Sequence, residues 1–236
     1  MDMLQSGVHF GHQTSRWHPK MAKFIYTIRN GVHVIDLEKT QKELEHTLNA
    51  VRQMASEGKA ILFVSTKPQG RAIVKQAAID CDSPYLIERW IGGMLTNFPE
   101  IKKLIGSYID MKSQQASGEL EKYTKKEQLE IAKDLEKKDH SLAGLVSVTK
   151  MPEVIFVPAL QREKTAVTEA NKMGITVIGV CDTNANPDKA DYIIPANDDA
   201  VKSIQLIVLA VAEAVKEGKK EYEKKKAEAA APVVKA

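Results

Sequence analysis

The sequence predicts a doubly wound α/β fold, in which helices cover both faces of a parallel sheet. Three short segments, residues 60–65, 154–157 and 176–180, are almost continuously apolar. Stretches in which apolar residues recur at helical spacing alternate with them along the chain. Strands without a polar face are typical of parallel sheets with helices on both sides. Such sheets bind their ligands at the carboxyl ends of the strands.

A β-hairpin is expected near the N-terminus. Residues 23–29 and 32–37 are rich in β-branched and aromatic side chains, and the Asn30-Gly31 pair between them is the strongest short signal for a hairpin turn. Residues 38–57 follow with the apolar stripe of an amphipathic helix.

The other elements of the α/β domain follow in alternation. We expect helices at residues 69–79, 163–172 and 199–216, and further strands near residues 85–87 and 192–194.

Residues 98–148 interrupt this alternation. Apolar residues recur there at helical spacing, and Thr124 and Glu127 resemble a capping box before a second, more charged helix. We therefore expect an antiparallel helical hairpin that protrudes from the sheet and contacts a partner. Residues 1–97 and 149–216 then form one globular α/β domain. The Lys-, Glu- and Ala-rich tail, residues 217–236, is expected to fray into disorder.

Composition restricts the class of protein. The chain has 236 residues, of which 43% are hydrophobic and 28% charged, enough for one substantial core. The formal net charge is only +3, so any binding of nucleic acid depends on where the cations lie. Cys81 and Cys181 do not suggest a disulfide scaffold, which fits a reducing cytoplasm. No export signal or membrane-spanning stretch is expected.

Residues 7–21 are the most informative segment, because histidines, cations and an indole gather there without helical or strand periodicity. Such side chains contact phosphates, sugars and unpaired bases in RNA-binding proteins. An alternative of equal weight is an arm that packs over its own domain, with Phe10 and Trp17 in the core.

Residues 88–98 are the second unusual segment, because Arg89, Trp90 and two glycines directly follow a predicted strand. The glycines permit close approach of another backbone, either from RNA or from the chain itself. The sequence leaves open whether Trp90 is buried in the core or presented to a ligand.

Enzymatic chemistry has little support. The sequence has no GxGxxG after a strand and no GxxxxGK[ST], the loops that bind phosphate in nucleotide enzymes. Thr66 is interpreted as a helix cap, and Lys67 and Arg71 are placed to meet an anion at the helix N-terminus. Asp182 and Asp188 are interpreted as turn residues rather than as a catalytic pair.

A metal site would have to gather His9, His12 and His18 with Cys181 and Asp182. These spacings match no familiar ligand pattern, and neighbouring cations would oppose binding. We therefore expect neither a metal nor another cofactor.

Several segments, in order and across nearly the whole chain, closely resemble the bacterial small-ribosomal-subunit protein two family, known as ribosomal protein S-two. The resemblance is carried by residues 7–12, 17–21, 29–31, 35–40, 61–64, 89–98, 182–184 and 197–199. It implies a flavodoxin-like sheet, a protruding helical hairpin and no catalytic activity. It also implies a cytoplasmic protein on the solvent side of the small ribosomal subunit, between head and body, which joins late in assembly.

The partners implied by this resemblance are small-subunit ribosomal RNA and neighbouring ribosomal proteins, including the large mRNA-binding first protein of the subunit. At matching positions, the residues expected to face RNA are Arg16, Lys20, Lys23, Arg29, Lys67 and Arg89. The predicted function is therefore a structural constituent of the small ribosomal subunit. The alternatives are a flavodoxin-like nucleotide- or phosphate-binding enzyme, supported mainly by residues 66–71, and a hairpin scaffold whose partner is a protein.

Overall fold

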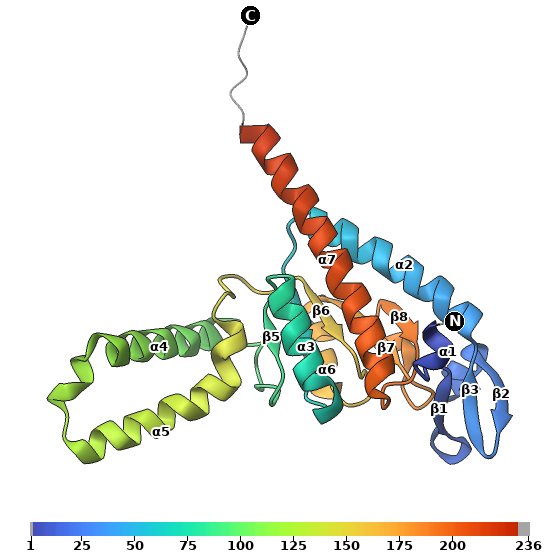
Figure 1. The fold of residues 1–236 in the computed structure, drawn as a ribbon, viewed down its shortest axis with the longest axis horizontal. Coiled ribbons are helices and arrows are strands. Elements are labelled where there is room, and N and C mark those ends of the chain that lie inside the picture. Colours follow the sequence, from blue (N-terminus) through green and yellow to red (C-terminus); the bar gives the residue numbers. More distant parts are fainter. Residues whose placement is uncertain (1, 231–236) are drawn as a thin grey trace, which may run out of the picture.

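A parallel sheet of five strands forms the centre of the protein, with the strand order β5-β4-β6-β7-β8 (Figure 1). The computed structural model describes residues 2–230. The strands of this sheet are β4 (Ile61–Val64), β5 (Tyr85–Leu86), β6 (Val154–Val157), β7 (Thr176–Cys181) and β8 (Tyr192–Pro195). All neighbouring strands run parallel. The doubly wound fold predicted from the apolar runs is confirmed.

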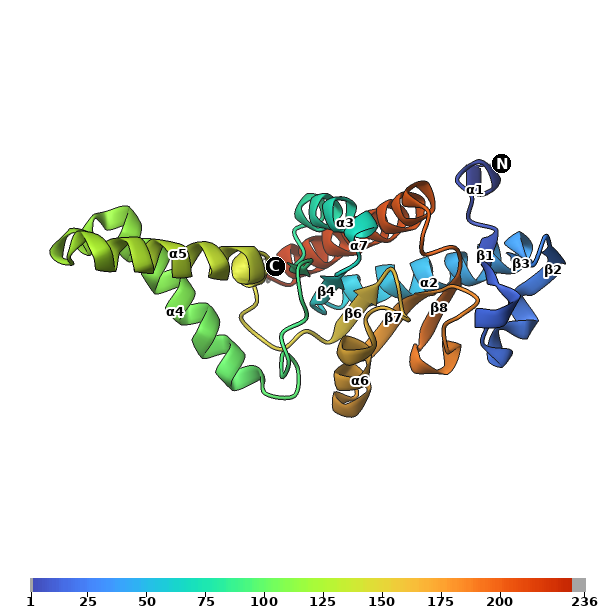
Figure 2. The same ribbon diagram turned by 90° about the horizontal axis from the view of Figure 1, so that it is seen from below.

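Side chains alternate between the two faces of the sheet, and each face has its own hydrophobic core. The helices that cover the sheet are α2 (Leu37–Ser56), α3 (Pro68–Asp80), α6 (Lys164–Met173) and α7 (Val201–Ala230). Ile61 and Phe63 of β4 pack in one core with α2, α3 and α7. Leu62 and Val64 of the same strand pack in the other core with α6, which lies across the sheet from α3 and α7 (Figure 2). Burial on both faces explains the continuously apolar strands.

The N-terminal residues form a second, antiparallel sheet of three strands in the order β1-β3-β2. Its strands are β1 (Phe10–Gln13), β2 (Ile25–Arg29) and β3 (Val32–Ile35). Asn30 and Gly31 join β2 to β3 with φ angles of 51° and 74°, as a type I′ turn requires, and the predicted hairpin is confirmed. The sequence does not predict β1, because this strand exists only through its pairing with β3. We call residues 7–35 the N-terminal arm.

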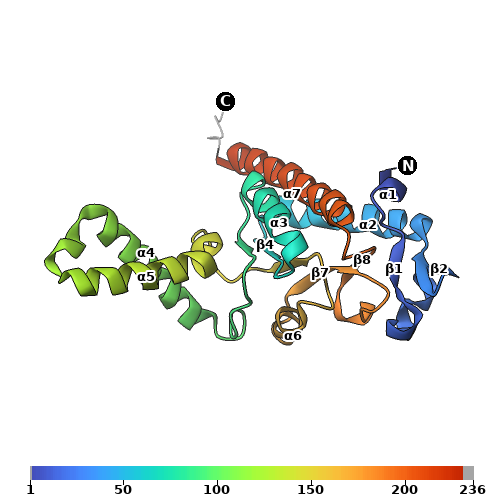
Figure 3. The same ribbon diagram turned by 60° about the horizontal axis from the view of Figure 1, so that its bottom comes forward.

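A helical hairpin, α4 (Phe98–Ser117) and α5 (Lys125–Leu142), protrudes from the α/β domain as predicted. The expected capping box begins α5: the backbone N–H of Glu127 donates to Thr124 Oγ1, and the Glu127 carboxylate accepts from the backbone N–H of Thr124. The buried ring of Tyr108 joins the two helices, because its hydroxyl donates to Asp139. Figure 3 shows the hairpin and the N-terminal arm at opposite ends of the domain.

The last helix, α7, is much longer than the predicted range of residues 199–216. It continues to Ala230, through most of the tail for which disorder is expected, and residues 231–236 lie outside the described residues. Packing against α2 and the residues just after it explains the extension as far as Tyr222. Gly218 allows a close approach, since a Cβ there would lie only 2.4 Å from the carbonyl oxygen of Arg52. One turn further on, the ring of Tyr222 lies against Gly58 at the end of α2.

Candidate functional site

Four of the cations expected to face RNA lie on the surface of the N-terminal arm. Arg16 ends a short 3-10 helix, Lys20 and Lys23 lie in the next one, and Arg29 is the last residue of β2. All four residues are exposed. The arm therefore presents positive charge from both of its 3-10 helices and from its hairpin.

These cations differ in how they are held. Lys20 forms an ion pair with Asp188, and the ammonium of Lys23 lies 4.8 Å from the centroid of the Phe24 ring. Within residues 2–230, the side chains of Arg16 and Arg29 have no hydrogen-bond or ion-pair partner. Their guanidinium groups are thus available to a ligand.

Large apolar side chains are exposed beside the cations. Phe10 is 53% exposed, Trp17 41% and Tyr26 76%. The alternative in which Phe10 and Trp17 belong to the core is therefore wrong; Met21 and Phe24 are the residues of this segment that are buried. Exposed aromatic rings next to arginines are typical of surfaces that stack on bases or on a protein partner.

The arm is anchored to the carboxyl end of the sheet through backbone contacts. The backbone N–H of His12 donates to Thr183 Oγ1 at 2.9 Å, and the N–H of His18 donates to the Thr183 carbonyl at 2.7 Å. Gly11 makes this contact possible, because a Cβ there would lie 2.6 Å from Cγ2 of Thr183. On the other side, the Asn197 side chain donates to the carbonyl of Gly7 at 3.0 Å.

A cluster of charged side chains reinforces this anchor. His12 Nδ1 lies 3.1 Å from Asp182 Oδ1, and His12 Nε2 lies 3.4 Å from Asp199 Oδ2. Lys67 donates to Asp198 Oδ1 at 2.8 Å and to Asp199 Oδ1 at 2.7 Å. The imidazole and the three carboxylates offer ligand atoms within 4.8 Å of one another and are of the types that hold a divalent cation. The Lys67 ammonium already pairs with two of these carboxylates, Asp198 and Asp199.

Burial and neighbouring charge perturb the groups of this cluster. Burial, and then the charge of Asp182, raise the pKa of Asp198 to about 6, although Lys67 acts in the opposite direction. The hydrogen bond to Asp182 raises the pKa of His12 despite partial burial, and the nearby carboxylates add to this effect. The cluster thus favours the protonated imidazole, which pairs the arm with the sheet.

The metal set considered from the sequence assembles only in part. His12 and Asp182 meet, but Nδ1 of His18 accepts from the backbone N–H of Lys20, away from the cluster. Cys181 is buried, and burial raises the pKa of its thiol. Asp198 and Asp199 complete the cluster instead. Sequence reasoning missed them, because no local pattern places the start of the last helix beside residue 12.

Lys67 and Thr66 have roles other than those expected. Lys67 is itself the N-cap residue of α3 and makes no side-chain cap bond, while its ammonium is held by Asp198 and Asp199. Binding of RNA by Lys67 stays a prediction, and it would compete with two carboxylates. Thr66 does not cap α3, because its N–H and hydroxyl both donate to the buried carboxylate of Glu163, at 2.6 and 2.7 Å.

Trp90 is buried, which settles the alternative that the sequence leaves open. The residue is 8% exposed, and its Nε1 donates to Glu169 on α6 at 3.0 Å. The neighbouring Arg89 is exposed, so the positive charge of this segment lies at the surface. Of the two unusual side chains in this segment, the cation is therefore the one that a ligand can reach.

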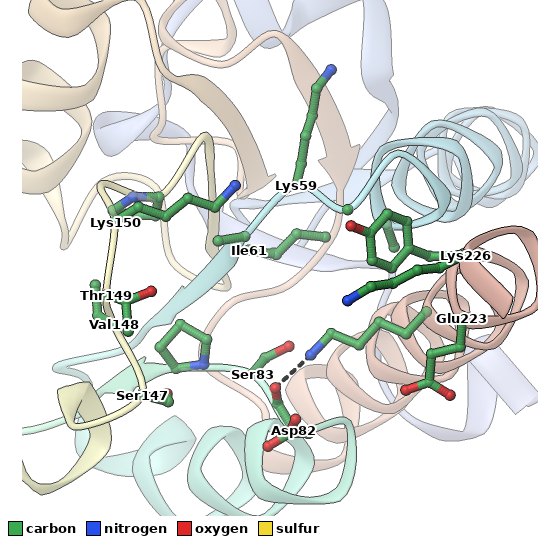
Figure 4. Close-up of a pocket in the computed structure, with 17 residues that line it drawn as sticks. Lys59, Ile61, Asp82, Ser83, Ser147, Val148, Thr149, Lys150, Glu223 and Lys226 are labelled. Atoms are coloured by element: carbon green, nitrogen blue, oxygen red, sulfur yellow. Dashed lines mark hydrogen bonds between the residues drawn. The ribbon is translucent and has the colours of Figure 1, made fainter. Parts of the chain in front are cut away.

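Away from the arm, a pocket of about 380 Å³ lies near the amino end of β4 (Figure 4). Its lining includes Lys59, Lys150, Lys219 and Lys226. Lys219 donates to the carbonyl oxygens of Cys81 and Asp82 at the end of α3, so its ammonium is committed to the fold. Lys59 and Lys150 pair with glutamates, at 2.8 Å in each case.

The sequence of the chain matches a known family. The profile of "Ribosomal protein S2" matches residues 3–218. The chain belongs to the ribosomal protein S2 family. It is 47% identical, over 217 residues, to "Small ribosomal subunit protein uS2" of Endomicrobium trichonymphae, covering 92% of this chain and 89% of the relative.

Two further relatives with the same name support the S2 assignment. The protein of Helicobacter hepaticus is 47% identical over 220 residues, which cover 93% of this chain and 83% of the relative. The protein of Wolinella succinogenes is 47% identical over 218 residues, which cover 92% of this chain and 80% of the relative. The resemblance and the flavodoxin-like sheet are thus confirmed, and membership in the S2 family makes the chain a structural protein and not an enzyme. Among the described residues, no helix has the length and apolarity needed to cross a membrane.

Proposed function

We propose that the protein is a structural constituent of the small ribosomal subunit and binds small-subunit ribosomal RNA through its N-terminal arm. Its relatives are named as small ribosomal subunit proteins, which supports a place in that subunit. The observation that supports RNA binding is the arm surface, which carries exposed aromatic residues together with Arg16 and Arg29, whose guanidinium groups have no partner within residues 2–230. Guanidinium groups hold phosphates by bidentate hydrogen bonds, and aromatic rings stack on unpaired bases.

Anchoring makes the arm a defined surface rather than a loose tail. Backbone hydrogen bonds and the charged cluster hold it against residues 182–199, so its cations keep a fixed spacing when RNA arrives. A surface that is already ordered loses less conformational entropy on binding.

The binding test replaces Arg16, Lys20 and Arg29 together by Ala. A control variant replaces Lys75, Lys172 and Lys220, which are exposed on other parts of the chain, and so removes the same charge. We expect the arm variant to bind a small-subunit RNA transcript more weakly, with a salt slope lower by about 2 to 3. The control variant should lose much less affinity for the transcript. Equal losses in the two variants would show that binding depends on net charge and not on the arm.

The helical hairpin is proposed to contact neighbouring ribosomal proteins during late assembly in the cytoplasm. Ile109 and Leu129 are exposed on its two helices, and such side chains favour a protein partner. The large mRNA-binding first protein of the subunit is a proposed neighbour of the chain. Deletion of residues 106–137 should leave a folded core but impair incorporation into small-subunit particles, as measured by co-sedimentation. Normal incorporation would show that the hairpin is dispensable.

A further inference from the structure

A cleft of about 530 Å³ opens at the carboxyl end of the parallel sheet. Three segments contribute to its lining. Thr66 and Arg71 follow β4, Arg89 follows β5, and Arg162 follows β6. The volume is that of a typical small-ligand site and is large enough for one nucleotide.

The topology of the sheet places this cleft where doubly wound folds bind ligands. From β4 the chain crosses to β5 on one side, whereas β6 lies on the other side of β4. The connection after β4 runs into α3 on one face, and the connection after β6 runs into α6 on the opposite face (Figure 2). Two neighbouring loops that leave in opposite directions open a crevice between them, at the switch point of the strand order.

Some charged groups of the lining already have partners within the protein, whereas others are free to donate to a ligand. Arg71 is held in place, because its Nη1 donates to the Glu88 carboxylate at 2.8 Å and its Nε donates to the Thr66 carbonyl at 3.2 Å. The Glu163 carboxylate is occupied by the N–H and hydroxyl of Thr66. Both acidic groups of the lining are therefore satisfied within the protein.

Arg89 and Arg162 are the available donors. Both are exposed, and in the part of the chain that the structure describes neither side chain has a hydrogen-bond or ion-pair partner. Gly92 also lines the cleft and leaves its part of it open, since nothing lies within 4 Å of a Cβ built there. An arginine pair of this kind suits the bidentate recognition of phosphate oxygens.

We propose that this cleft binds one phosphodiester group of a single-stranded RNA segment, held by Arg89 and Arg162. The proposal rests on the RNA-binding function proposed above and assigns it a second contact, separate from the arm. The charge of the lining favours a phosphodiester: three arginines against two glutamates leave one positive charge. A phosphodiester carries one negative charge, whereas the terminal phosphate of a free nucleotide carries nearly two at neutral pH.

The experiment compares the full chain with the double variant Arg89→Gln, Arg162→Gln. Both side chains are exposed and unpaired, so the variant should keep the wild-type circular dichroism spectrum and melting temperature. We expect binding of a small-subunit RNA transcript to weaken about tenfold and the salt slope to fall by about 0.7, as for one phosphate of a single strand. The variant Arg89→Lys, Arg162→Lys keeps the charge but not the bidentate geometry and should recover part of the loss.

Location is tested by photocrosslinking with RNA that contains 4-thiouridine. We expect a crosslink to residues 158–173 that survives in the arm variant and is lost in the double glutamine variant. If RNA binding and this crosslink are unchanged in the double variant while the arm variant binds weakly, the cleft is not an RNA site, although the proposed function stands. If the wild-type chain does not bind the transcript, the proposed function fails as well.

Two probes separate RNA from smaller phosphate compounds. Adenosine monophosphate and inorganic phosphate, each added at about 1 mM before irradiation, should not lower the yield of the RNA crosslink. A lower yield with either one would show that the cleft is a site for a free phosphate compound, and this result would overturn the proposal.

Discussion

The indole nitrogen of Trp90 donates a hydrogen bond of 3.0 Å to the carboxylate of Glu169, which joins the segment after β5 to α6. The same carboxylate accepts from the backbone N–H groups of Gly93 and Leu95, at 3.0 and 3.2 Å. One acidic side chain therefore fixes both the buried ring and the path of the glycine-containing loop. Arg89, which lines the proposed RNA cleft, precedes Trp90 directly and depends on this loop for its position.

Replacement of Glu169 by Ala should lower the free energy of unfolding by about 2 to 3 kcal/mol. The change leaves the Trp90 indole and at least two backbone N–H groups without their acceptor, and hydrogen bonds to a charged group are worth about 1.5–3 kcal/mol each. Urea denaturation measures the effect. Glu130→Ala, which removes an exposed glutamate of α5, should change stability by less than about 0.5 kcal/mol. Equal effects of the two changes would contradict the role assigned to Glu169.

Acid should weaken the same interaction. Burial raises the pKa of Glu169, but hydrogen bonds from Trp90 and from the loop N–H groups outweigh it, and the pKa lies below the ordinary value of 4.5. A carboxyl group with a lowered pKa stabilises the folded state above its unfolded pKa, and this contribution is lost as the pH falls through the folded pKa. Wild-type protein should therefore lose more stability between pH 6 and pH 3 than Glu169→Gln does. Urea midpoints at each pH measure this difference. Equal losses of stability in the wild type and in Glu169→Gln would contradict the expected effect of acid on Glu169.

Two glycines inside helices should respond in opposite ways to replacement by Ala. At Gly106 in α4, nothing lies within 4 Å of an added Cβ, so Gly106→Ala should stabilise the protein by about 0.5–1 kcal/mol through helix propensity. At Gly218 in α7, the Cβ would meet the backbone of α2, so Gly218→Ala should destabilise it by about 1–3 kcal/mol. Thermal unfolding of both variants decides the matter, and stabilisation by Gly218→Ala would show that α7 does not pack on α2 in this way.

The capping box of α5 should have a local effect. Thr124→Ala removes the acceptor of the Glu127 N–H and should lower the local stability of α5 by about 1 kcal/mol. Amide hydrogen exchange should accelerate in the first turns of α5, while the amides of β6 keep their protection. Thr168→Ala, a threonine inside α6, is the matched control and should leave α5 unchanged. Faster exchange throughout the domain would mean that the hairpin and the sheet unfold together.

Local signals were sufficient where the decisive interaction is short-range. The Asn30-Gly31 turn and the Thr124 to Glu127 box are both recognisable within four residues, and both are confirmed. The apolar strands were equally clear, because burial on both faces leaves no polar position.

Long-range pairing explains what the sequence did not reveal. The strand β1 depends on β3, and α7 extends past residue 216 because Gly218 meets α2 and Tyr222 lies against Gly58, just after α2. Within the candidate site, the exposed arm cations follow from composition, but Lys67 is held by Asp198, a residue 131 positions away. Arg162 gave no sequence signal, since a lone arginine before a helix is typical of any solvated surface.

The anchoring of the arm has a consequence for biosynthesis. The carbonyl of Gly7 accepts its hydrogen bond from Asn197, which is added to the chain 190 residues later. At a synthesis rate of about 5–20 residues per second, roughly 10 to 40 s separate the two events. Throughout this interval the N-terminal arm, with its cations and aromatic rings, lacks the residues 182–199 to which it is anchored in the folded protein. During this period chaperones or polyanions have access to the segment, because the residues that anchor it have not yet been synthesised.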